Sequence, residues 1–356
     1  MENFDEYIRQ GEPNKTEKAK VWKTAIGLQK VDGLKPSDYL IETAKQNIEG
    51  DITFEEVKKR IDRYYEQNPT KSKADRTEEA DKVAARIAEI LSEQTFTFSP
   101  AEYLFIHHRL FQGIYEFAGK IRDYNITKQE WVLNGETVFY GSAESLKSTL
   151  EYDFEQEKKF KYKGLSQQET IEHIVHFISY LWQIHVFGEG NTRTTALFLI
   201  KYLRTFGFKV NNELFEQHSW YFRNALVRCI YKNHTKNIHA TNEFLLRFFG
   251  NLLFEQNHNL KNHEMKIHVS DTVKTQNSLV NFEIDTVNDT VNDTVFSLIK
   301  QNGKIRVSEI SDRLKISLST AKRKVKELKA QNIIERVGSD KTGHWKIIEN
   351  QTTFRI

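Results

Sequence analysis

The chain has 356 residues, with 52 Lys and Arg against 49 Asp and Glu, and its one cysteine is Cys229. This length suits two or three domains, and the near balance of charge excludes nucleic-acid binding through bulk charge alone. A single cysteine excludes an intrachain disulfide and a cysteine-rich zinc site, and it favours a reducing compartment. No signal peptide opens the sequence, and no run of about 18 apolar residues could span a bilayer. We therefore expect a soluble, cytoplasmic protein without a membrane partner.

The N-terminal part, residues 1–70, is expected to be a small helical unit. The whole chain has only four prolines and is rich in Leu, Ile, Lys and Glu, which favours helix. Two predicted helices, 15–31 and 37–49, stop near Gly33 and Gly50. A third begins at residue 53, where Thr53 and Glu56 form a capping box. The polar residues 69–80 are interpreted as a linker.

The largest predicted unit spans residues 80–255 and is also mainly helical. Its helical pattern breaks at residues 126–140, where β-branched and aromatic residues surround Asn134-Gly135, a strong signal for a β-hairpin. The polar residues 256–290 are interpreted as a linker, and residues 291–356 as a compact last unit. Helices are expected within 84–91, after 99–100, and over 143–157, 167–184, 192–206 and 217–255.

The segment from Ile184 to Arg193 carries the clearest chemical signal. Apolar residues recur at helical spacing on both sides of it, so a short loop is expected to join two buried helices, with Asn191 capping the second. The free N–H groups and dipole of that helix start favour an anion, and Gly190 lets the backbone approach a phosphate. Arg193 can bind phosphate oxygens, and Glu189 supplies a carboxylate suited to Mg²⁺.

His185 completes this set as a base able to work near neutral pH. Alone, a histidine on an apolar helix is usually a packed core residue, and a Gly-Asn pair is usually only a cap. The ordered combination instead predicts attack of a hydroxyl on a nucleotide phosphate.

The stretch HVFGEGNTR, residues 185–193, resembles the signature of the Fic/Doc (Fido) family, H-x-F-x-[D/E]-G-N-[G/K]-R-x-x-R. The stretches 115–126 (YEFAGKIRDYNI) and 131–140 (WVLNGETVFY, here called the flap) are similar to the family's lead-in and its β-hairpin flap, so the resemblance covers roughly residues 98–250. It implies a mainly α fold: a Fic-type helical domain with a β-hairpin flap, an N-terminal helical module and a C-terminal winged helix-turn-helix.

The resemblance also implies an activity, the transfer of AMP from ATP to a Ser, Thr or Tyr hydroxyl of a protein, with Mg²⁺. His185 would deprotonate the hydroxyl and Glu189 would hold the metal. The nucleotide would be bound by Phe187, Gly188, Gly190, Asn191, Thr192 and Arg193. A target segment would be aligned by backbone pairing with the flap residues Val132, Leu133, Asn134, Gly135, Glu136 and Thr137.

Two positions depart from the signature: Thr192 stands at the Gly-or-Lys position, and Ala196 replaces the last arginine. Ala196 cannot reach a distal phosphate, and losing one such charge-assisted contact costs about 1.5–3 kcal/mol. Transfer of another nucleotide or of a phosphoryl group therefore stays open beside AMP transfer. A DNA-binding regulator with a degenerate, nucleotide-sensing Fic domain is the rival from another class. The target protein and the oligomeric state are not determined by the sequence.

The N-terminal helices resemble the small antitoxin modules that accompany some Fic toxins, whose motif [S/T]-x-x-x-E-[G/N] places a glutamate beside the ATP γ-phosphate site. Asp32 stands at the glutamate position and Leu28 at the Ser/Thr position. The usual partner of that glutamate is the last arginine of the signature, which is Ala196 here. The glutamate and its arginine partner have therefore both been replaced in this chain. We expect residues 1–70 to pack on the active site and restrain it, with Asp32 as the inhibitory residue; a plain helical lid is the alternative.

Residues 291–356 have the pattern of three helices followed by a hairpin, which looks like a winged helix-turn-helix. Val325 and Leu328 should face its core. DNA contacts are expected from Ser319, Thr320, Lys322, Arg323 and Lys326. Winged helices also bind proteins, and a lysine-rich surface helix is often only solvated. Protein binding and a helix without a partner therefore remain alternatives to DNA binding.

Overall fold

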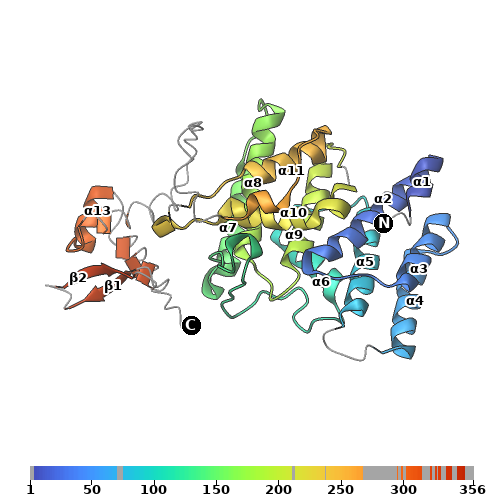
Figure 1. Ribbon diagram of the computed structural model, residues 1–356, viewed down its shortest axis with the longest axis horizontal. Helices are drawn as coiled ribbons and strands as arrows, with labels where there is room; N and C mark the ends of the chain where they lie inside the picture. Colours follow the sequence, from blue (N-terminus) through green and yellow to red (C-terminus); the bar gives the residue numbers. More distant parts are fainter. Residues whose placement is uncertain are drawn as a thin grey trace. The chain divides into compact units, whose positions relative to one another are not determined.

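The chain forms two compact units, Met1–Thr275 and Gln276–Ile356. The computed structural model describes residues 4–69, 75–210, 213–236 and 238–267 in the first unit. In the second it describes residues 295, 298–299, 302–314, 321–322, 325–326, 328–329, 334–338 and 343–348. The predicted mainly α fold is confirmed (Figure 1). In the described part of the chain, no helix is both long enough and apolar enough to cross a bilayer.

The N-terminal part follows the helix pattern expected from its caps. Ser37 and Thr53 accept hydrogen bonds from the N–H groups of Leu40 and Glu56, and Gly33 and Gly50 end their helices with φ of 70° and 92°. The predicted helix 15–31 tightens into a 3₁₀ turn at Leu28. The elements are α1 (Asp5–Gln10), α2 (Pro13–Gly27), η1 (Leu28–Asp32), α3 (Asp38–Glu49), α4 (Phe54–Gln67) and α5 (Thr77–Ser92). Helix α5 thus begins inside the interval predicted as a linker.

The following elements surround two long central helices, α8 and α9. Helix α8 opens with a capping box between Ser166 and Glu169. The predicted helix 217–255 is interrupted, because α10 and α11 are separated by residues 231–242. The elements are α6 (Pro100–Phe111), η2 (Trp131–Leu133), η3 (Ala143–Ser145), α7 (Leu146–Lys159), α8 (Gln167–Ile184), α9 (Asn191–Thr205), α10 (Glu213–Ile230), η4 (His234–Lys236), α11 (Glu243–Phe254) and η5 (Asn262–Met265).

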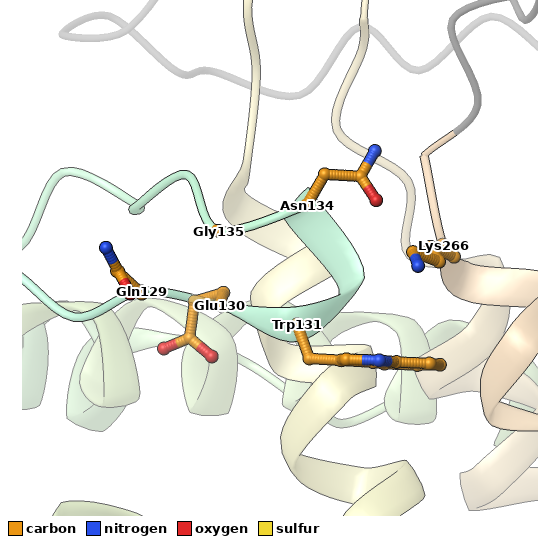
Figure 2. A pocket seen from close by; sticks show the side chains of 6 residues that line it. All are labelled: Gln129, Glu130, Trp131, Asn134, Gly135 and Lys266. Atoms are coloured by element: carbon orange, nitrogen blue, oxygen red, sulfur yellow. The ribbon is translucent and has the colours of Figure 1, made fainter. Parts of the chain in front are cut away.

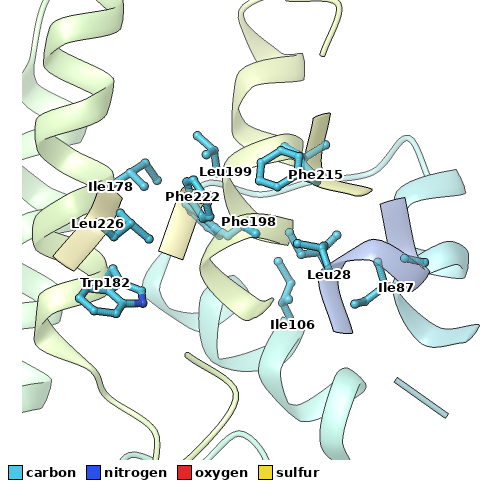
Figure 3. Packing of buried hydrophobic residues seen from close by; sticks show 14 of the residues in the cluster. Leu28, Ile87, Ile106, Ile178, Trp182, Phe198, Leu199, Phe215, Phe222 and Leu226 are labelled. Carbon is cyan, nitrogen blue, oxygen red and sulfur yellow. The ribbon is translucent and has the colours of Figure 1, made fainter. Parts of the chain in front are cut away.

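One hydrophobic core joins the N-terminal helices to the rest of this unit. Leu28 of η1 lies among the same buried side chains as Ile106 of α6 and Phe198 of α9 (Figure 3). A Cβ on Gly27 would lie 2.1 Å from the Cα of Glu216, so only glycine lets α2 approach α10 this closely. The predicted boundary near residue 70 therefore falls inside one compact unit.

The flap does not form the predicted β-hairpin. The turn itself is present, with Asn134 and Gly135 at φ of 54° and 89°, but residues 131–133 form the 3₁₀ turn η2 and residues 126–140 contain no strand. The neighbouring side chains of Val132 and Leu133 are both fully buried. A strand would send them to opposite faces, so the packing of both residues in the core favours a turn.

The first part of the predicted linker 256–290 is also packed. Leu260, Met265 and Ile267 are 8%, 1% and 6% exposed and belong to the main core. The prediction of a linker is therefore wrong for residues 256–267, and residues 268–290 lie outside the described residues.

The second unit has its own small core, which includes Val325 and Leu328 as predicted. Its described elements are α13 (Val307–Leu314), β1 (Ile334–Val337) and β2 (His344–Ile347). The strands pair antiparallel, with Ile334 opposite Ile347. This small sheet agrees with the hairpin predicted for the winged helix.

Candidate active site

His185 lies at the end of α8 in a left-handed conformation, with φ of 52°. Its Nδ1 lies 3.2 Å from the carbonyl oxygen of Trp182. Because a carbonyl only accepts, Nδ1 must carry the proton in this contact and Nε2 must carry the lone pair. This is the tautomer that a general base at Nε2 requires.

The imidazole of His185 is buried, with 2% of the residue exposed. Nε2 has no hydrogen-bond partner among the described residues, and the ring of Tyr140 from the flap lies 4.2 Å away. Burial, followed by the nearby Lys128 cation, holds the pKa of His185 well below its ordinary value. The expected base near neutral pH is thus a neutral imidazole, and a hydroxyl reaches it only when a covering side chain moves.

Arg122, to which the sequence assigned no role, holds the backbone around His185. Its guanidinium donates to the carbonyl oxygens of His185 at 2.7 Å, Gly141 at 2.6 Å and Ile184 at 3.4 Å. Its own N–H donates to the carbonyl of Val186 at 2.9 Å. Arg122 lies in the segment 115–126 that resembles the family lead-in, but nothing in that pattern marks it as the support of the histidine.

His107 of α6 supports the loop from the opposite side. Its ring stacks on Phe187 with 3.6 Å between ring centroids, and its Nε2 lies 3.0 Å from the carbonyl oxygen of Glu189. Because Nδ1 accepts from the N–H of Gly119 at 2.8 Å, Nε2 must be the donor. Phe187, expected among the nucleotide-binding residues, is thus buried against His107, a partner that the sequence did not reveal.

The burial of His107 gives a testable dependence of stability on pH. Burial lowers its pKa from 6.5 to about 3, so between these values the unfolded chain binds a proton that the folded chain does not. This residue should therefore lower the free energy of unfolding by about 1.4 kcal/mol for each pH unit of acidification. Urea titrations at several pH values should show that His107→Gln removes this part of the slope; an unchanged slope would contradict the buried, neutral ring.

The prediction that Asn191 caps α9 is wrong: Asn191 is the first residue of the helix, and the N-cap is Gly190, without a side-chain cap bond. The Asn191 side chain bonds back to the loop instead. The side chain of Asn191 donates to the carbonyl of Phe187 at 2.8 Å and accepts from its N–H at 3.1 Å. Gly190 adopts φ of 78°, and a Cβ there would lie 2.4 Å from the ring of Phe111. Thr192 accepts from the indole N–H of Trp182 at 3.0 Å, so this departure from the signature ties α9 to α8.

Glu189 is the acidic residue of the loop, and its side chain is 33% exposed. One oxygen accepts from the N–H of Gly190 at 3.3 Å, and the other lies 3.4 Å from the ammonium of Lys128. Gly188 approaches the Tyr124 hydroxyl, which a Cβ would meet at 2.5 Å. Glu189 is thus the accessible carboxylate beside the helix start, with one lysine as its counter-ion.

Arg193 is fully buried and already neutralised by two carboxylates. Its Nε lies 2.7 Å from Oδ2 of Asp32 in an ion pair without hydrogen-bond alignment, and its Nη2 donates to Glu79 at 2.7 Å. Its Nη1 donates to Gln29 at 3.1 Å. Burial opposes ionisation of Glu79, but Arg76 and Arg193 hold the pKa of Glu79 below its ordinary value. The N-terminal part therefore takes the guanidinium that a phosphate would need.

The flap residues have different environments. Val132 and Leu133 are buried, whereas the turn at Asn134 and Gly135 borders a pocket of about 510 Å³ (Figure 2). Glu136 is held by Tyr231 and by Asn233 at 3.3 Å, and the hydroxyl of Thr137 accepts from the N–H of Lys128 at 3.2 Å. Val132 and Leu133 could contact a target segment only through their backbone groups.

In the second unit, Lys322 and Lys326 are exposed, whereas Ala321 and Val325 are buried. The remaining predicted DNA-contacting residues, Ser319, Thr320 and Arg323, lie outside the described residues.

Residues 97–203 match the Fic/DOC family, and residues 295–335 match the winged helix-turn-helix DNA-binding family. The chain carries a Fic/DOC domain. Its signature loop holds His185, Glu189 and Arg193 in the places described above.

Two solved structures are similar to this chain. The N-terminal FIC domain of Bep8, a VirB-translocated effector from Bartonella sp. 1-1C, shares 19% identity over 51% of this chain and 85% of its own, with a TM-score of 0.39. A Fic family protein from Desulfovibrio desulfuricans G20 shares 13% identity over 99% of this chain and 95% of its own, with a TM-score of 0.42.

Proposed function

We propose that the Fic domain transfers AMP from ATP to a Ser, Thr or Tyr hydroxyl of a target protein. Fic membership supports transfer of a nucleotidyl or phosphoryl group to proteins. The observation that carries the proposal is the lone pair on Nε2 of His185, which is buried and unpartnered among the described residues. His185 begins the loop that leads into α9, whose N-terminus favours phosphate.

In this reaction, Nε2 of His185 takes the proton of the target hydroxyl while its oxygen bonds to the α-phosphorus of ATP. The bond from that phosphorus to the bridging oxygen breaks, and pyrophosphate leaves. The contact of Nδ1 with Trp182 and the grip of Arg122 on the His185 carbonyl keep the imidazole in the required tautomer and place. The N–H groups of the first turn of α9 face the phosphates.

Mg²⁺ suits the chemistry of this loop. Glu189 offers one partly exposed carboxylate, and Mg²⁺ commonly takes one or two carboxylates together with phosphate oxygens and water. Lys128 now neutralises this carboxylate and would have to give it up. When bound, the metal would neutralise phosphate charge.

We also propose that Asp32 restrains the enzyme. Its carboxylate is 2.7 Å from Arg193, whose side chain is 0% exposed. The antitoxin-like motif was expected to act through the position that is Ala196 here, and Ala196 is buried and apolar. The ion pair supports inhibition through the retained arginine instead, because a carboxylate and a phosphate compete for one guanidinium.

Labelled ATP tests the reaction. Purified protein and cell lysate are incubated with ATP labelled at the α- or the γ-phosphorus, with His185→Ala as control. We expect transfer of the α-label only, and none with the control. Transfer of the γ-label would show phosphoryl transfer in place of AMP transfer. If the variant Asp32→Ala, in which Arg193 is released from Asp32, also transferred no label, a nucleotide-sensing domain would be favoured.

A second function, DNA binding by the C-terminal unit, is favoured by the winged-helix match and by the exposed Lys322 and Lys326. If both lysines contact phosphates, replacing them by alanine in the full chain should reduce by about two the slope of log affinity against log salt concentration. Titrations of a labelled duplex at several salt concentrations measure this slope. The same slope in both proteins would place DNA contacts elsewhere.

A further inference from the structure

The flap already has a backbone partner within this chain. The N–H of Ile267 donates to the carbonyl of Val132 at 2.9 Å, and the side-chain amide of Asn134 donates to the carbonyl of Ile267 at 2.9 Å. Residues 262–267, here called the docked segment, follow α11 by eight residues and include η5. Figure 2 shows Lys266 of this segment beside Trp131 and Asn134 of the flap.

The docked segment is anchored along its length. The side chain of Asn262 accepts from Asn224 at 2.8 Å, and Glu264 pairs with Arg247 at 3.1 Å. Met265 and Ile267 are buried, whereas the Lys266 ammonium lies 5.3 Å from the centroid of the Trp131 ring. Alternate side chains thus enter the core while the backbone of Ile267 meets the flap.

Ile267 forms hydrogen bonds with the flap groups that would bind a target segment. The side chains of Val132 and Leu133 are buried, so an extended target can contact these two residues only through the backbone of the flap. The carbonyl of Val132 and the amide of Asn134 are both taken by Ile267. A target segment and the docked segment therefore need the same two groups.

We propose that the docked segment competes with a target segment for the edge of the flap at Val132 and Asn134, the surface to which the family resemblance assigns the target. Only the identity of the competitor rests on the proposed function. Because the docked segment belongs to the same chain, its effective concentration at the flap is on the order of millimolar. A target must therefore bind strongly enough to displace the docked segment, or bind after the docked segment has left the flap.

A peptide with the sequence of residues 262–267 is the probe, labelled with a fluorophore and titrated into the full chain. Ile267→Pro removes the donated N–H, so this variant should bind the peptide at least tenfold more tightly than the unaltered chain. Adding Asn134→Ala should reverse the gain, because the flap loses its own donor. Lys261→Ala is the matched control and should bind like the unaltered chain, since Lys261 is exposed and precedes the docked segment.

Equal peptide affinity of Ile267→Pro and the unaltered chain would overturn the proposal. Because proline also disturbs a buried position, a second measurement uses the intact residue. The Ile267 amide should exchange with deuterium at least tenfold more slowly than in the free peptide, and Asn134→Ala should accelerate it. Equal exchange in chain and peptide would also overturn the proposal. Neither readout requires catalysis, so loss of AMP transfer alone would refute the proposed reaction and leave the docking surface standing.

Discussion

Replacing Asp32 with alanine is expected to tighten the binding of Mg²⁺ and ATP at least tenfold. The substitution removes the carboxylate 2.7 Å from Nε of Arg193 and leaves in place the hydrogen bonds that Arg193 donates to Glu79 and Gln29. The released Nε could then donate a charge-assisted hydrogen bond to a phosphate, which contributes about 1.5–3 kcal/mol, and 1.4 kcal/mol corresponds to a factor of ten. Calorimetric titration of the variant and the unaltered chain measures the difference.

Asp51→Ala is the matched control, because Asp51 is an exposed acid of the same N-terminal part. It should leave nucleotide affinity unchanged. Equal affinity in Asp32→Ala and the unaltered chain would contradict restraint through Arg193. A point substitution is sharper than deletion of residues 1–68, since these residues contribute Trp22, Leu28 and Leu40 to the shared core, and their loss would expose it.

Replacing Arg193 with alanine is expected to destabilise the protein by about 3–5 kcal/mol. The change leaves Glu79, with a side chain 8% exposed, and Asp32, 15% exposed, without their common counter-ion. Removing one partner of a buried ion pair costs this much. Asp32 loses its described counter-ion, whereas Glu79 keeps its ion pair with Arg76 at 2.7 Å. Urea-induced unfolding followed by circular dichroism measures the change.

The control for this prediction is Lys59→Ala, which breaks an exposed pair with Glu55 on one helix and should leave the unfolding midpoint unchanged. Combining Arg193→Ala with Asp32→Asn and Glu79→Gln should recover much of the loss, because the buried negative charges disappear. If Arg193→Ala were no less stable than Lys59→Ala, the result would contradict a stabilising role of the buried pairs of Arg193 with Asp32 and Glu79.

Local patterns in the sequence predicted the parts of the site that depend on neighbouring residues. The cap at Thr53 was readable because a cap needs only residues within one helical turn. The loop from His185 to Arg193 was readable for the same reason, as one contiguous stretch. Its placement between α8 and α9 follows from the periodicity on both sides.

Contacts between distant segments could not be read in this way. Arg122 reaches the carbonyl of His185 across 63 residues, and Arg193 reaches Glu79 across 114. The Asn134-Gly135 signal predicted a turn, but the joint burial of Val132 and Leu133, which excludes a strand, is a tertiary property. Residues 256–267 were polar enough to suggest a linker, yet a few apolar side chains suffice to dock them.

Mass spectrometry of Asp32→Ala and of Asp32→Ala/His185→Ala, each incubated with Mg²⁺, ATP and cell lysate, tests the central claim most directly. We expect AMP bonded to a Ser, Thr or Tyr side chain with the first protein, more than with the unaltered chain, and none with the second. The same adduct at the same yield in both variants would contradict a transfer site that works through His185.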